Sequence, residues 1–92
     1  MNTLLSDQKT SSEIGNIIAS RIRKIRRRRK ISQTELSKRS GVSLGSLKRF
    51  EQTGEISLKS LTNIAIALDI EDELFSLFEE APFLSIEEII NG

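Results

Sequence analysis

Apolar residues recur every three or four positions along most of the chain, the spacing that places side chains on one face of an α-helix. The first such segment begins near Glu13, and we expect Ser11 or Ser12 to cap it. Its apolar stripe consists of Ile14, Ile17, Ile18, Ile22 and Ile25. No stretch of useful length alternates apolar and polar residues as a strand would. The pattern therefore predicts an all-α fold.

Four more helices follow from the same periodicity and from the residues that begin and end helices. Ser32 and Glu35 have the spacing of a capping box, and Gly41 follows at the point where a left-handed residue ends a helix. A third helix is expected from Ser43 to about Gln52. The fourth begins after Ser57 with the apolar face Leu58, Leu61, Ile64, Ala65 and Leu68. The fifth carries Leu74, Phe75, Leu77 and Phe78 and ends before Pro82.

Residues 33–51 form a helix, a tight turn and a second helix, and the second helix divides into two faces. Steps of about 100° per residue define these faces. The face expected to pack against other helices holds Ser43, Ser46, Leu47 and Phe50. The outward face holds Leu44, Gly45, Lys48, Arg49 and Gln52. The outward set is cationic and has one very small residue.

Such a face suits the major groove of DNA. Arg49 can bind guanine O6 and N7 bidentately, and Lys48 can do the same or bind phosphate. Leu44 can contact a thymine methyl group. Gly45 lets the backbone approach the bases, although simple tolerance of a glycine explains it equally well. Gln33, Thr34 and Ser43 lie at helix N-termini, whose free N–H groups suit phosphate oxygens.

The charge distribution agrees with a polyanionic partner. The net charge is only +1, but residues 21–59 hold 13 of the 14 Lys and Arg against three acids, a net of +10. Residues 60–92 hold eight acids and no Lys or Arg, a net of −8. Within the basic run at residues 27–30, Arg28 is a candidate phosphate contact, and a solvated helix end is the alternative.

Composition excludes most other functions. The 92 residues include no cysteine and no histidine, which removes disulfides, thiolate metal sites and the usual general base. We therefore expect no enzyme, no metal and no cofactor. The apolar runs are far shorter than the roughly 20 residues that cross a bilayer, and residues 1–13 do not resemble a secretory signal. The expected location is the cytoplasm, on the nucleoid.

The chain resembles the phage-repressor helix-turn-helix family of the Cro-like, or XRE, type. The matching residues are Arg26, Gln33, Leu36, Gly41, Val42, Ser43, Leu47 and Glu51. The resemblance covers about residues 14–78 and implies a five-helix bundle of the lambda-repressor-like type, which we place at residues 13–80. We expect a disordered arm at 1–12, because these residues are polar and aperiodic, and a short tail at 81–92. The resemblance also implies that Gln33 binds phosphate, that Leu44, Gly45 and Arg49 face bases, and that Arg26 pairs with Glu51.

Residues 43–78 further resemble the HipB-type antitoxins that are encoded beside HipA-like kinases. That resemblance implies a homodimer on a palindromic double-stranded DNA operator, autorepression and a complex with a kinase toxin. A phage-type lysogeny regulator and a protein-interaction adaptor that does not bind DNA are the alternatives. The candidate dimer or partner contacts are Phe83, Ile86, Ile89 and Ile90, together with Leu84, Phe75 and Phe78. Packing into the core is the alternative role of Phe75 or Phe78.

Overall fold

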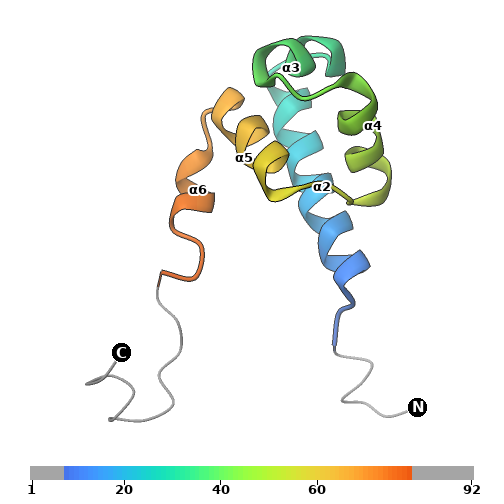
Figure 1. The fold of residues 1–92 in the computed structure, drawn as a ribbon, viewed down its shortest axis with the longest axis vertical. Helices are drawn as coiled ribbons and strands as arrows, with labels where there is room; N and C mark the ends of the chain where they lie inside the picture. The colour runs from blue at the N-terminus through green and yellow to red at the C-terminus, as the bar shows by residue number, and fades with distance from the viewer. Residues whose placement is uncertain (1–7, 80–92) are drawn as a thin grey trace.

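The computed structural model describes residues 8–79, and in this range the chain forms five α-helices and no strand (Figure 1). They are α2 (Ser11–Arg28), α3 (Gln33–Ser40), α4 (Leu44–Thr53), α5 (Leu58–Ala67) and α6 (Glu71–Phe75). The all-α class predicted from periodicity is confirmed for this part of the chain. Pro82, the tail at 81–92 and the first seven residues of the predicted arm lie outside the described residues.

The long helix α2 supports the two helices of the helix-turn-helix unit. Helix α4 packs against α2 and α3, and α5 packs against α3 (Figure 1). Helix α6 packs against α5, and Figure 1 shows it standing apart from α2 and α4. The outward face of α4 and the apolar face of α6 therefore lie on different parts of the molecule.

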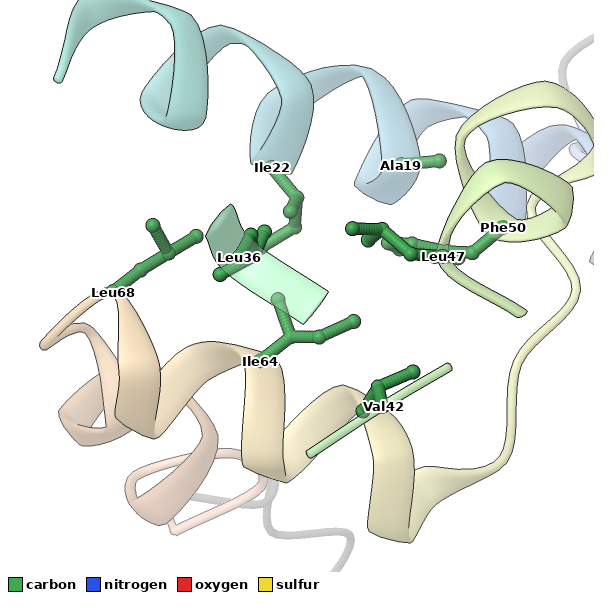
Figure 2. Close-up of a cluster of buried hydrophobic side chains, with 8 residues drawn as sticks. All are labelled: Ala19, Ile22, Leu36, Val42, Leu47, Phe50, Ile64 and Leu68. Atoms are coloured by element: carbon green, nitrogen blue, oxygen red, sulfur yellow. The ribbon is translucent and has the colours of Figure 1, made fainter. Parts of the chain in front are cut away.

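A small aliphatic core holds α2 to α5 together. Figure 2 shows its side chains pointing toward one another from four helices and one turn: Ala19, Ile22, Leu36, Val42, Leu47, Phe50, Ile64 and Leu68. All eight are buried. Burial of apolar side chains at about 25 cal/mol per Å² is the main force that holds such a bundle together.

Hydroxyl caps start four of the helices. Ser32, Ser43 and Ser57 each accept a hydrogen bond at 3.0–3.1 Å from the backbone N–H three residues later, as predicted. The expected cap of α2 at Ser11 or Ser12 is wrong. Thr10 caps this helix, because Thr10 and Glu13 have the capping-box spacing and the Thr10 hydroxyl accepts from Glu13 N–H at 3.1 Å. Ser11 and Ser12, which were expected in the arm over 1–12, therefore belong to α2.

The capping box predicted at Ser32 is only half formed. Ser32 accepts from the Glu35 N–H, but the Glu35 carboxylate accepts from Arg39 Nε at 3.0 Å instead of turning back to the cap. Arg39 lies one turn further along α3, on the same face as Glu35, so the ion pair takes the carboxylate.

Left-handed residues end four helices. Gly41 has a φ of 73° after α3, as predicted, and Gly54 has a φ of 78° after α4. Lys30 and Asp69 adopt the same conformation after α2 and α5, with φ of 57° and 62°. After each of these two, the next N–H donates to a carbonyl five residues back, at 3.1 Å for Ile31 and 2.9 Å for Ile70. This hydrogen bond satisfies a carbonyl that the helix leaves free.

Two expectations about burial and one about the end of a helix are wrong. Ile14 is exposed, because the start of α2 extends beyond the helices that pack on it (Figure 1). Leu58 is exposed on the first turn of α5. The last helix stops at Phe75 instead of including Phe78, and residues 76–79 form turns. Phe75 and Phe78 are 89% and 86% exposed, so neither belongs to the core.

Candidate nucleic-acid interface

The turn between α3 and α4 is fixed by short polar contacts. The Ser37 hydroxyl donates to the Val42 carbonyl at 2.6 Å, and the Val42 N–H donates to the Ser40 hydroxyl at 3.1 Å. The Val42 side chain is buried in the core. These contacts set the angle between α3 and α4, so the outward face of α4 is held rigidly on the bundle.

Helix α4 has one buried side and one exposed side. Leu47 and Phe50 are buried against the other helices. The predicted outward residues Gly45, Lys48, Arg49 and Gln52 are all exposed, and Leu44 at the start of the helix is half-buried. The structure therefore brings the five predicted residues together on or beside one solvent-facing surface.

Two serines were assigned to the wrong face. Ser43 and Ser46 were expected to pack inward, but both are exposed. They lie at the first turn of α4, where their hydroxyls bond to each other at 2.9 Å and Ser43 caps the helix. Local capping uses these side chains, so the buried stripe of α4 is narrower than angular position alone suggests.

A buried ion pair joins α2 to α4. Arg26 Nε and Nη2 donate to the two carboxylate oxygens of Glu51, each at 2.8 Å, and the side chains are only 9% and 4% exposed. Arg26 Nη1 also donates to the Ile31 carbonyl at 3.0 Å. Removing one member of such a pair leaves an unpaired buried charge, at a typical cost of about 3–5 kcal/mol.

The same carboxylate orients Gln33 at the start of α3. Gln33 Nε2 donates to Glu51 Oε1 at 3.1 Å. One Nε2 hydrogen and the amide oxygen of Gln33 are free of this contact. The side chain is thus positioned beside the N-terminus of α3, whose backbone N–H groups suit an anion.

An open recess of about 380 Å³ lies where α2, α3 and α4 meet. It is lined by Arg23, Arg26, Arg27, Ser32, Gln33, Glu51 and Gln52. Of the arginines that line it, Arg23 is half-buried and Arg27 is exposed. The angular position of a residue around α2 places it relative to the apolar stripe. It does not show that α4 makes contacts at the edge of that stripe. Thr34 and Arg28 are exposed nearby on α3 and at the end of α2.

Glu55 is a neighbour of Arg49 that sequence reasoning missed. Its Oε2 accepts from Arg49 Nη2 at 2.6 Å and from Arg49 Nε at 3.1 Å. Glu55 lies outside α4, beyond the left-handed Gly54. Helical spacing does not relate residues across such a turn, so the pattern of α4 carried no signal for this contact.

The predicted dimer or partner residues Phe83, Ile86, Ile89 and Ile90 lie outside the described residues. The described chain nevertheless has an apolar groove of about 540 Å³ between α5 and α6. Leu58, Ile66, Phe75, Leu77 and Phe78 line it, and all five are exposed. Within residues 8–79, no three acidic side chains are grouped as metal ligands, and no helix has the length and apolar character to span a membrane.

A family model described as helix-turn-helix matches residues 22–75, more than half of the chain. The match covers the buried ion pair, the turn at Gly41 and the whole of α4. Comparisons with curated proteins and with solved structures give no match.

Proposed function

The chain belongs to the helix-turn-helix family of DNA-binding transcription regulators, and from this premise we propose that it is a sequence-specific repressor. The observation that carries the proposal is the exposed cationic face of α4, with Lys48 and Arg49 beside the small Gly45. A helix held in the major groove reads bases with such side chains.

The surroundings of α4 support contacts with the DNA backbone. Gln33 and Thr34 lie at the N-terminus of α3, and Ser43 caps α4. Arginines of α2 line the neighbouring recess, and Arg28 is exposed at the end of α2. We assign these groups to phosphates, which fix the position of the protein on the duplex without reading sequence.

We further propose a homodimer that binds a palindromic operator. One α4 helix reads only a few base pairs, and helix-turn-helix dimers place two such helices about one turn of DNA apart. The apolar groove between α5 and α6 is the candidate contact, since Phe75 and Phe78 are almost fully exposed on it. The apolar residues Phe83, Ile86, Ile89 and Ile90 would extend the same contact.

A role as an autoregulating antitoxin beside a HipA-like kinase toxin is a finer version of this proposal. It rests on the resemblance of residues 43–78 to HipB-type proteins and on the acids Glu71 and Asp72 at the apolar groove. An acidic, apolar surface suits a basic protein partner. A complex between the purified chain and the product of a neighbouring kinase-like gene would support this role, and its absence would favour a lysogeny regulator.

Selection from a pool of random-sequence duplexes tests the proposed function. The expected result is enrichment of one motif with two inverted half-sites about 10 base pairs apart or a multiple of that spacing. Titration of the enriched duplex should then show affinity that falls linearly with salt on logarithmic scales. Binding without enrichment would show that the chain does not read bases. No binding at low salt would favour the alternative of a protein-interaction adaptor that does not bind DNA.

A further inference from the structure

The contact between Arg49 and Glu55 has a geometry that matters for base reading. Arg49 gives two donors to one Glu55 oxygen, Nη2 at 2.6 Å and Nε at 3.1 Å. The side chains are 69% and 64% exposed. Exposed ion pairs contribute little to folding stability, so stability does not account for this arrangement.

The backbone of Glu55 is held in place without the Arg49 side chain. Its N–H donates to the Thr53 hydroxyl at 3.2 Å, and that hydroxyl donates to the Arg49 carbonyl at 2.7 Å. The preceding Gly54 lies against the backbone of α2, where a Cβ on Gly54 would come within 2.4 Å of the Gly15 carbonyl carbon. The Glu55 carboxylate is therefore attached to a fixed turn of backbone.

The contact occupies one edge of the guanidinium and leaves another edge free. A guanidinium carries five N–H donors in a rigid plane. Glu55 takes the edge formed by Nε and one hydrogen of Nη2. The edge formed by Nη1 and the second hydrogen of Nη2 is free of this contact, and two parallel donors are what guanine O6 and N7 accept. Glu55 thus restrains the plane of the Arg49 guanidinium without using the N–H donors that a bidentate base contact needs.

Resting on the proposed function, we propose that Glu55 is a positioning residue that sharpens base selection by Arg49. It fixes the guanidinium plane, so the side chain loses less freedom when it meets a guanine and is less able to turn toward a phosphate. Its negative charge also repels phosphates. Glu55 therefore lowers affinity for unrelated DNA while it raises discrimination at the base pair that Arg49 contacts.

The test compares Glu55→Ala with the matched control Glu35→Ala. Glu35 forms the same kind of exposed pair, with Arg39 Nε at 3.0 Å, so both variants remove one acid from one exposed arginine. The probes are the duplex enriched from the random pool, its single-base-pair substitutions and an unrelated duplex. Discrimination is the ratio of the Kd for a substituted duplex to the Kd for the enriched duplex.

Glu55→Ala should lower discrimination about five-fold or more at one base pair, a substantial part of what a bidentate contact supplies. Its discrimination at the other base pairs should match that of Glu35→Ala. In an Arg49→Ala background, Glu55→Ala should have no further effect at that base pair. A purely structural role would instead affect all duplexes alike.

Several results would overturn the inference. Glu55→Ala could match Glu35→Ala at every base pair, or it could lower discrimination just as much without Arg49. In both cases the wild-type chain still selects a motif, so the proposed function stands and only the role of Glu55 fails. If the wild-type chain binds no duplex or selects none, the proposed function and this inference fail together.

Discussion

At the scale of residues, the chemistry depends on which arginine can reach which part of the DNA. Arg49 projects from the outward face of α4, whereas Arg28 lies exposed at the end of α2. Both carry the same guanidinium, but only a side chain on the inserted helix reaches base edges. The two arginines should therefore have different effects on selectivity.

Substitution of each arginine by alanine separates these roles. Arg49→Ala should weaken binding to the enriched duplex by about 1–3 kcal/mol and relax the preference at one base pair. Arg28→Ala should weaken binding to all duplexes alike and reduce the salt slope by about one. Fluorescence anisotropy titrations at several salt concentrations measure both effects. A uniform loss for Arg49→Ala would make it a phosphate contact, and an unchanged slope for Arg28→Ala would leave it in solvent.

The residues of the candidate site differ in how far sequence could predict them. Helical angle placed Gly45, Lys48, Arg49 and Gln52 on one exposed face because a single helix carries them all. The 2.8 Å contact between Arg26 and Glu51 was anticipated only through the resemblance, since 25 residues separate the two. Glu55 had no such signal, because its approach to Arg49 depends on the left-handed turn at Gly54.

At the scale of elements, periodicity and capping residues predicted five helices, and the errors occur at their ends. The glycine at position 41 predicted a left-handed residue correctly. Lys30 and Asp69 adopt the same conformation although neither is a glycine. Packing of the following Ile31 and Ile70 against the core accompanies these two turns. Helix α6 ends at Phe75, although the apolar pattern continues to Phe78.

Gly15 and Gly45 both lie within helices, but their substitution by alanine should change the free energy of unfolding in opposite directions. A Cβ on Gly15 would lie 2.8 Å from the Gly54 carbonyl oxygen, a backbone atom that cannot rotate away, whereas a Cβ on Gly45 would meet nothing within 4 Å. Gly15→Ala should lower the free energy of unfolding by about 1–2 kcal/mol, because overpacking exceeds the gain in helix propensity. Gly45→Ala should raise it by about 0.5 kcal/mol.

Urea denaturation of both variants beside the wild-type chain measures these changes. A Gly15→Ala variant as stable as Gly45→Ala would mean that α2 and the turn at Gly54 do not approach as closely as described. The DNA affinity of Gly45→Ala is a separate readout. Weaker binding by this more stable variant would indicate that the backbone of α4 approaches the bases at Gly45.

At the scale of the whole molecule, the chain has two ends of opposite character. Thirteen of the 14 Lys and Arg lie between positions 21 and 59, and the acids dominate from position 60 onward. The described structure separates them in space, with α4 on one side of the bundle and α6 packed only beside α5 (Figure 1). We therefore propose that DNA at α4 and a protein at α6 are bound at the same time.

Substitution of the exposed Phe75 and Phe78 tests the proposed dimer contact at the groove between α5 and α6. The double variant Phe75→Ser and Phe78→Ser should shift the chain from dimer toward monomer in analytical ultracentrifugation, because it removes apolar surface from the proposed contact. Its fold should persist, since both side chains are almost fully exposed. Ile14→Ser is the matched control, an exposed apolar residue outside the α5–α6 groove. Equal association constants for all three proteins would remove this groove from the dimer.

The most direct test of the central claim maps the DNA-binding surface by NMR, following backbone amides as the enriched duplex is added. The account predicts that the largest chemical-shift changes occur at the start of α3 and along α4, at Gln33, Thr34, Gly45, Lys48, Arg49 and Gln52. Amides of α6 should change least. Changes concentrated on α5 and α6, with α4 unaffected, would contradict the assignment of α4 as the helix that reads DNA.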